Sequence, residues 1–160
     1  MGNLVLLHVG AGGRYYEGFI NSDRSEINHQ GRKIKIDEIL ELSKPWLHDS
    51  ESVDGIVGMA VFQQLYWREL VFALREAYRV LKKGGILRMG VPLLENGFPL
   101  EHLLGWNNIN LFTYELLERV LLNHIGFSSC RLYNYQQSLL PELGKLDNRS
   151  DHIFYIEAIK

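Results

Sequence analysis

The sequence predicts an α/β protein with a Rossmann-like, doubly wound and mostly parallel sheet of about six or seven strands, whose C-terminal strand runs antiparallel. Short apolar segments alternate along the chain with segments of helical periodicity. The first, residues 4–9, is apolar except for His8 and ends at the glycine-rich turn 10–13, as is typical of a strand buried on both faces. Strand, helix and strand in this order predict right-handed parallel crossovers.

The remaining elements follow from composition and spacing. Further strands are expected at 52–59, 85–91, 127–135 and 152–159, and helices at 67–81 and 113–125. Lys82, Lys83 and Gly84 predict the end of the first helix, and its Gly84 is expected to take a left-handed conformation there. Thr113 is expected to cap the second helix, whose apolar stripe is predicted as Leu116, Leu117, Val120, Leu121 and Ile125. The polar stretch 136–151 is long enough for the last strand to return antiparallel.

The length and the net charge of the chain limit the functions that it can have. We expect one domain over residues 1–160, because 160 residues with 46% hydrophobic content suffice for one sizeable core. A net charge of -2 and a pI near 6.3 disfavour nucleic acid and anionic membranes as partners. A single cysteine, Cys130, and the lack of a signal-peptide pattern predict the cytoplasm. No apolar run approaches the roughly 20 residues that span a bilayer, and the oligomeric state is left open.

The glycine turn and the next acidic residue indicate a ligand site. A dinucleotide-binding motif would place a third glycine at Tyr15 and an acidic residue about 20 positions further on, whereas Asp23 follows Gly12 by only eleven. Residues 14–18 as helix would rise about 7–8 Å, which cannot recross the first strand, so the usual first helix must be reduced to a turn. An extended crossing brings Asp23 beside the turn, where a carboxylate suits the two hydroxyls of a ribose. The alternatives are that the glycines form only a tight turn and that Asp23 is a solvated loop residue.

Four segments of the sequence resemble a known protein family. Residues 7–23 (LHVGAGGRYYEGFINSD), 41–56 (ELSKPWLHDSESVDGI), 75–92 (REAYRVLKKGGILRMGVP) and 121–127 (LLNHIGF) are similar to a small branch of the class I S-adenosylmethionine-dependent methyltransferases with an abbreviated first helix. The resemblance covers nearly the whole chain and implies S-adenosylmethionine as the cofactor. It implies that the cofactor-binding residues are Gly10, Ala11, Gly12, Gly13, Asp23, Glu41, Leu42, Met59 and Ala60.

The resemblance also implies a role for each of these residues. The turn 10–13 would pass close to the amino acid portion and the ribose of the cofactor, and Asp23 would bind the ribose. Glu41 would face the adenine amino group and Leu42 would line the adenine pocket. Met59 and Ala60, at the end of the fourth strand, would lie under the sulfonium.

Two departures from the family concern catalysis. The chain has V-F-Q-Q at 61–64, where the family often has V-L-E-H, and Pro92-Leu93, where many relatives have Pro-Asp. Both remove ionisable groups near the expected site of methyl transfer, so the catalytic residue is unknown. His102 is a weak candidate for a base, with a surface loop histidine as the alternative. His8 is expected to be a hydrogen-bonded core residue, the segment 92–112 is expected to close as a lid, and no metal site is expected.

The resemblance implies methyl transfer to a small-molecule acceptor. Similar small methyltransferases often occur in sugar or cell-surface glycan pathways, so the resemblance implies a sugar or a cell-surface glycan precursor as the acceptor. Transfer from a sulfonium needs in-line approach in a dry site, and a base is optional. One alternative is a degenerate cofactor-binding domain that acts through a protein partner, because the ionisable groups are missing. The other is a nicotinamide-dependent oxidoreductase, which the absent third glycine disfavours.

Overall fold

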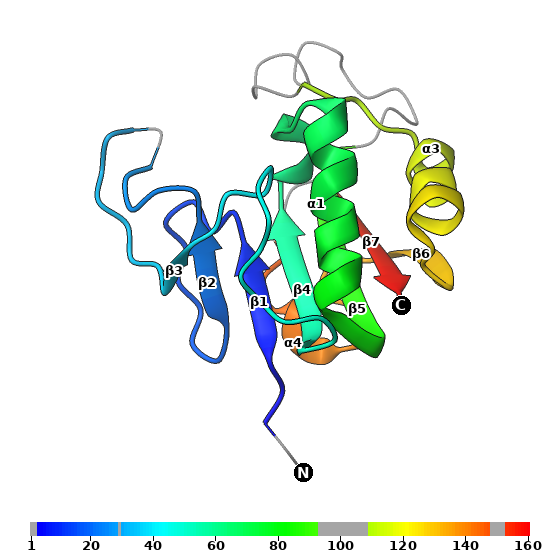
Figure 1. Cartoon of the computed structure of the whole chain (residues 1–160), viewed down its shortest axis with the longest axis horizontal. Helices are drawn as coiled ribbons and strands as arrows, with labels where there is room; N and C mark the ends of the chain where they lie inside the picture. The colour runs from blue at the N-terminus through cyan, green and yellow to red at the C-terminus, as the bar shows by residue number, and fades with distance from the viewer. Residues whose placement is uncertain (1–2, 29, 93–108, 148–152) are drawn as a thin grey trace.

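The described residues form a seven-stranded mixed sheet (Figure 1). The computed structural model describes residues 3–28, 30–92, 109–147 and 153–160. The strand order is β3-β2-β1-β4-β5-β7-β6. The first five strands pair in parallel and β7 pairs antiparallel with both of its neighbours, so the predicted fold class is confirmed. The strands are β1 (Leu6–Val9), β2 (Ile20–Asp23), β3 (Glu38–Ile39), β4 (Val53–Met59), β5 (Leu81–Val91), β6 (Ser129–Tyr133) and β7 (Phe154–Ile159).

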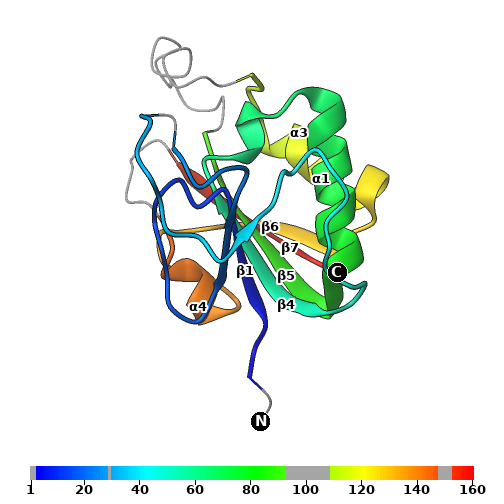
Figure 2. The same cartoon turned by 60° about the vertical axis from the view of Figure 1, so that its left-hand side comes forward.

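Helical elements cover the two faces of the sheet unequally. One face carries the long helix α1 (Trp67–Val80) and the helix α3 (Tyr114–Arg119) with its continuation η2 (Val120–Ile125), while α4 (Pro141–Gly144) lies on the other face (Figure 2). Two clusters of buried apolar residues correspond to these two faces. In the part of the chain that the structure describes, no helix has the length and apolarity needed to cross a membrane.

Helix α1 forms as its periodicity predicts but ends earlier. The Glu69 carboxylate accepts a 2.9 Å hydrogen bond from the Tyr66 main-chain nitrogen at the start of the helix. The helix ends at Val80, one residue before the expected end at Leu81, and Leu81 is already extended and paired with Val53 of β4. Gly84 has the expected left-handed conformation, with φ +76°, but it lies in a register shift of β5 and does not cap the helix, and its nitrogen donates to the carbonyl of Lys160. The physical reason is that the sheet pairing of Leu81 ends the helix before the glycine is reached.

The structure confirms the predicted cap of helix α3 but corrects its predicted apolar stripe. The Thr113 hydroxyl accepts a 3.2 Å hydrogen bond from the nitrogen of Leu116. Leu117, Val120 and Leu121 are buried, but Leu116 is 40% exposed. Leu116 lies about 100° around the helix from Leu117, outside the buried face. The helix continues as the π-helical segment η2 and ends at Gly126, whose φ is +105°.

No helix joins β1 to β2 within the described crossing 10–19, as the spacing predicted. The fully buried side chain of Asn21 holds this crossing in place. Its Oδ1 accepts from the Tyr16 nitrogen at 3.0 Å, and its Nδ2 donates to the carbonyls of Tyr16 and Phe19 at 2.9 and 3.0 Å. One asparagine side chain therefore supplies hydrogen bonds that a helix would otherwise provide for this crossing.

A buried ion-pair network attaches the segment after β6 to the sheet. The polar stretch 136–151 was expected only to cross an edge, but its part up to Asp147 packs on β5 and β7. Arg88 donates to Asp147 at 2.8 and 2.6 Å and to Glu157 at 2.7 Å, and all three side chains are fully buried. Burial opposes the charge on Arg88, but the hydrogen bonds and charges of the two carboxylates outweigh it and raise the pKa of Arg88.

Candidate active site

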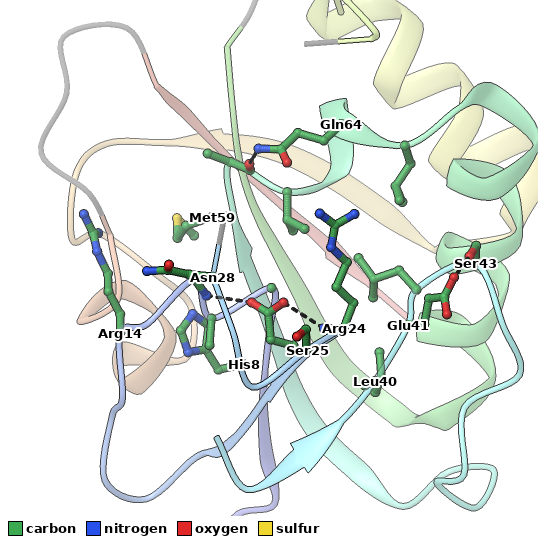
Figure 3. Close-up of a pocket in the computed structure, with 18 of the residues that line it drawn as sticks. His8, Arg14, Arg24, Ser25, Asn28, Leu40, Glu41, Ser43, Met59 and Gln64 are labelled. Carbon is green, nitrogen blue, oxygen red and sulfur yellow. Dashed lines mark hydrogen bonds between the residues drawn. The ribbon is translucent and has the colours of Figure 1, made fainter. Parts of the chain in front are cut away.

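A cavity of about 820 Å³ lies at the carboxyl ends of β1, β2 and β4 (Figure 3). Open α/β sheets bind ligands at this edge, and the volume is ordinary for a small-molecule site. Eight of the nine residues expected to bind the cofactor line the cavity, namely Gly10, Ala11, Gly12, Asp23, Glu41, Leu42, Met59 and Ala60.

The ninth residue, Gly13, is not part of the cavity lining. Its φ is +99°, and an added Cβ would lie 3.0 Å from Cγ2 of Ile34. Gly13 therefore turns toward the segment after β2 and allows close packing there. Gly10 is required for a different reason: at φ +65°, an added Cβ would lie 2.5 Å from Cγ2 of Val61. The turn can approach the loop after β4 only because Gly10 has no side chain.

The carboxylate of Asp23 is held in place by two main-chain nitrogens. Oδ2 accepts from the nitrogen of Gly12 at 2.7 Å, and Oδ1 accepts from the nitrogen of Arg24 at 2.7 Å. Each carboxylate oxygen keeps a further lone pair for a ligand. The side chain is half-buried and lines the cavity, so Asp23 offers a fixed acceptor at the end of β2.

The segment after β3 forms one wall of the cavity. The main-chain nitrogen of Leu40 donates to the carbonyl of Asp23 at 2.9 Å, and the side chains of Leu40 and Leu42 are buried. Glu41 is exposed between them and contacts Lys44 at 2.7 Å. Hydrogen bonds from Lys44 and Ser43 lower the pKa of Glu41. An exposed pair of this kind is weak, so the Glu41 carboxylate remains available as an acceptor beside an apolar wall.

The end of β4 combines close packing with a strained main chain. An added Cβ on Gly90 would overlap the sulfur of Met59, so this glycine of β5 makes room for the Met59 side chain. Ala60 has φ +55°, a conformation that non-glycine residues rarely adopt. Its nitrogen donates to the Gly90 carbonyl and its carbonyl accepts from Nε2 of Gln64, both at 2.8 Å. Strain held in this way is common at ligand sites.

His8 is a cavity residue that the sequence did not place there. It is 3% exposed and lines the cavity, and its Nδ1 lies 3.1 Å from Oδ1 of Asn21. Because Nδ2 of Asn21 donates to three acceptors, including Asp37, the orientation of the amide is fixed and Oδ1 must accept from His8. This network assigns the proton to Nδ1 and leaves a lone pair on Nε2.

The environment of His8 favours the uncharged ring. Burial lowers the pKa of His8, as does the charge of Arg14, while the Asn21 hydrogen bond and Asp23 act in the opposite direction. The expected hydrogen bond is present, but the side chain belongs to the site as well as to the core. In the sequence, the only sign that His8 lines the cavity was its position, because this polar residue interrupts an apolar strand two positions before the glycine turn.

The segment 24–36 adds a wall that the sequence did not predict. Its two arms are joined by a bridge between Ile27 and Lys33 and by a 2.9 Å hydrogen bond from the nitrogen of Asn28 to the carbonyl of Arg32. Arg24, Ser25, Ile27 and Asn28 all line the cavity. Figure 3 shows His8, Arg14 and Met59 on the side of the cavity away from Glu41 and Ser43.

Most of the expected lid lies outside the described residues, and so does His102, the candidate base. Of the segment 92–112, Ile109 lines the cavity. The nitrogens of Ile109 and Asn110 both donate to the carbonyl of Gln63 at 2.9 Å, which attaches the end of this segment to the loop after β4. Within the described ranges, no group of three or more histidine, cysteine or acidic side chains could hold a metal ion.

The central part of the sequence matches the model of a known protein family. Residues 15–89 match a methyltransferase domain. This range contains β2 to β4, helix α1 and most of β5, and with them Asp23, Glu41, Leu42, Met59 and Ala60. No curated protein sequence matches the chain.

Solved structures share the fold at low sequence identity. An S-adenosylmethionine-dependent methyltransferase from Thermotoga maritima is 17% identical, with a TM-score of 0.70 over 100% of this chain and 84% of the other. One from Archaeoglobus fulgidus is 16% identical, with a TM-score of 0.68 over 99% and 87%. The trans-methyltransferase CalH, solved in complex with S-adenosylhomocysteine, is 14% identical, with a TM-score of 0.62 over 99% and 52%.

Proposed function

We propose that this chain is a class I S-adenosylmethionine-dependent methyltransferase and that it methylates a small hydroxylated acceptor, such as a sugar or a glycan precursor. The match of residues 15–89 to a methyltransferase domain and the shared fold support the proposal. The observation that carries the proposal is the cavity in which eight of the nine expected cofactor-binding residues meet. When bound there, S-adenosylmethionine supplies an electrophilic methyl group on a positively charged sulfur.

The residues of the cavity fit the parts of this cofactor. The buried side chains of Leu40 and Leu42 offer an apolar surface for the adenine, and Glu41 offers an acceptor for its amino group. The anchored carboxylate of Asp23 offers its remaining lone pairs to the two ribose hydroxyls. Because Gly12 has no Cβ, the ligand can approach the main chain closely at this point.

The opposite side of the cavity suits the amino acid portion of the cofactor. Arg14 lines this side and forms no ion pair among the described residues, so its guanidinium can pair with a carboxylate. Met59 and Ala60 would lie under the sulfur, where a thioether and a methyl side chain keep water away from the reacting atoms. The protein would bind, orient and desolvate the reactants.

The choice of acceptor rests on the resemblance to methyltransferases of sugar pathways and on polar side chains in the cavity lining. Asn28, Ser25 and Tyr16 are among the residues that line the cavity. Amide and hydroxyl side chains of this kind can hydrogen-bond the hydroxyls of a small polar acceptor.

Calorimetric titration with S-adenosylmethionine, S-adenosylhomocysteine and NAD, run in parallel, tests the proposed site. Micromolar binding of the two sulfur compounds without NAD is expected. A screen of sugars, nucleotide sugars and other hydroxylated compounds, followed by release of S-adenosylhomocysteine, then tests the acceptor. Cofactor binding without turnover on any acceptor would favour a degenerate domain that acts through a partner, and binding of NAD alone would overturn the proposal.

A further inference from the structure

The cavity contains a buried histidine with an unused lone pair. In the described part of the chain, His8 is the histidine that lines the cavity. Its Nδ1 is occupied by Asn21, and its Nε2 makes no hydrogen bond to any described residue. Because the residue is only 3% exposed, a partner for this lone pair must be a ligand or a water inside the cavity.

The side chain of Asn21 fixes which nitrogen carries the lone pair. Nδ2 of Asn21 donates to three acceptors, so Oδ1 accepts from Nδ1 of His8 and Nε2 stays unprotonated. Tyr16 packs against the imidazole edge to face, with ring centroids 5.4 Å apart. Burial lowers the pKa of His8, as does the charge of Arg14, while the Asn21 hydrogen bond and Asp23 oppose them. Nε2 is therefore a fixed acceptor, and the group that satisfies it must be a hydrogen-bond donor.

Arg14 lies at the same end of the cavity as His8 (Figure 3). Its main-chain nitrogen donates to the carbonyl of Ala11 at 2.9 Å, which attaches Arg14 to the glycine turn. Its guanidinium forms no ion pair among the described residues, and its charge acts on His8. A free cation beside a neutral acceptor complements a ligand group that carries both a negative charge and a hydrogen-bond donor.

The order of the parts of S-adenosylmethionine brings its amino acid portion to this end. The apolar wall of Leu40 and Leu42 suits the adenine, and the carboxylate of Asp23 suits the ribose. The amino acid portion is joined to the ribose through the sulfur, on the side away from the adenine, so it extends toward His8 and Arg14. The adenine amino group and the ribose hydroxyls are then used elsewhere, and the α-ammonium group is the donor that remains for Nε2.

Two other side-chain acceptors of the cavity are less suited to the ammonium group. Oδ1 of Asn28 already accepts two hydrogen bonds of 3.0 Å, from the main-chain nitrogens of Gln30 and Arg32. The carboxylate of Asp23 accepts from two main-chain nitrogens and has its remaining lone pairs at the ribose. Nε2 of His8, in contrast, has no hydrogen bond to give up when the ligand binds.

We propose that His8 binds the α-ammonium group of the cofactor at Nε2, so that His8 and Arg14 together recognise the amino acid portion as a zwitterion. The ammonium donates to the imidazole lone pair, and the carboxylate pairs with the guanidinium. No covalent bond is made or broken in this step, and His8 acts as a binding residue. The inference rests on the proposed function, since it needs the cofactor in this cavity.

The test compares three ligands that differ only in the amino acid portion. S-adenosylhomocysteine carries both charged groups, its deaminated analogue has hydrogen in place of the ammonium, and its decarboxylated analogue has hydrogen in place of the carboxylate. Calorimetry measures the affinity of each for the wild type, His8→Phe and Arg14→Gln. His8→Phe keeps a ring against Tyr16, and Oδ1 of Asn21 still accepts from the Tyr16 nitrogen. His124→Phe is the matched control, because His124 is exposed on η2.

The two variants should lose the recognition of different groups. The wild type should bind S-adenosylhomocysteine roughly tenfold or more tightly than the deaminated analogue, because a charge-assisted hydrogen bond is missing from the latter. His8→Phe should abolish this preference but keep the preference over the decarboxylated analogue. Arg14→Gln should do the reverse, and His124→Phe should change neither. A general disturbance of the cavity would instead weaken the binding of all three ligands.

Two results with His8→Phe would overturn the proposal. An equal loss of affinity for all three ligands would mean that His8 only shapes the cavity. An unchanged preference for S-adenosylhomocysteine over the deaminated analogue would place the ammonium at another acceptor. Failure of the wild type to bind S-adenosylhomocysteine would overturn the proposed function itself, which distinguishes that failure from failure of the role of His8.

A measurement on the wild type keeps the proposal testable if circular dichroism shows that His8→Phe does not fold. In ¹⁵N NMR spectra, free His8 should show a protonated Nδ1 and an unprotonated Nε2. S-adenosylhomocysteine and its decarboxylated analogue should both shift the Nε2 signal, because both carry the ammonium. The deaminated analogue should shift it much less, and equal shifts by all three ligands would contradict the assignment.

Discussion

The main-chain nitrogen of Gly12 donates a 2.7 Å hydrogen bond to the carboxylate of Asp23 and so fixes the turn after β1 to the end of β2. The same carboxylate accepts from the nitrogen of Arg24. These two bonds hold Asp23 in position before any ligand binds, which reduces the entropy lost on binding. Residues eleven positions apart in the sequence thus form one unit of the site.

Replacement of Asp23 should weaken cofactor binding. We expect Asp23→Ala to lower the affinity for S-adenosylhomocysteine by about 1–3 kcal/mol, because it removes the acceptor for the ribose and leaves the Gly12 nitrogen unpaired. Asp23→Asn should have a smaller effect, since it keeps one acceptor oxygen. Calorimetry measures both, with Glu17→Gln as the control at an exposed carboxylate on the same crossing. Equal affinities for Asp23→Ala and the wild type would remove Asp23 from the site.

An added methyl group on Gly10 should destabilise the protein through Val61. Gly10→Ala introduces a Cβ 2.5 Å from Cγ2 of Val61 at a residue with φ +65°, and overpacking of this kind costs about 1–3 kcal/mol. Val61→Ala in the same chain should restore part of the loss, because it removes the contact with Cγ2 but leaves the Cβ of residue 61 at 2.8 Å and the main chain strained. The free energies of unfolding in urea, measured for both single variants and the double variant, should show this coupling. Strictly additive effects would mean that the two residues do not interact.

Loss of the buried ion pair between Arg88 and Asp147 should lower the free energy of unfolding far more than loss of an exposed ion pair. Asp147→Ala leaves part of a fully buried guanidinium without its partner, and we expect a loss of about 3–5 kcal/mol in the free energy of unfolding. The exposed pair of Glu115 and Arg119, with a 3.0 Å contact, is the matched control, and Glu115→Gln should cost less than about 1 kcal/mol. Chemical denaturation compares the two variants. Similar losses would show that Arg88 is satisfied by other groups.

Protonation of His8 should make stability depend on pH. The pKa of His8 is lowered from 6.5 in the folded protein, so the unfolded chain binds the proton more readily as the pH falls. The stabilisation is complete above pH 6.5 and decreases as the pH falls through the folded pKa. Urea unfolding at pH 7.5 and pH 5.5 should therefore show a larger loss for the wild type than for His8→Gln, which cannot take up this proton. Glu38, whose pKa burial raises, acts equally in both proteins and cancels in the comparison.

Local patterns were sufficient for much of the fold and of the site. The apolar run before Gly10 predicted β1, and the short distance from Gly12 to Asp23 predicted a crossing without a helix, which the structure confirms. Helical periodicity predicted α1 and α3, but the end of α1 at Val80 depends on the pairing of Leu81 with β4. Element ends were less predictable because they depend on contacts with distant segments.

What the sequence by itself determined was the α/β class, the glycine turn and the meeting of Asp23 with Gly12, because chain length, periodicity and the freedom of glycine are local properties. Only the tertiary structure decided that Gly13 turns away to Ile34, that His8 lines the cavity, and that Arg88 meets Asp147 in the core. Each of these depends on which segments pack side by side. The physical reason is that burial and partner choice are set by contacts between residues far apart in the chain, which no local pattern encodes.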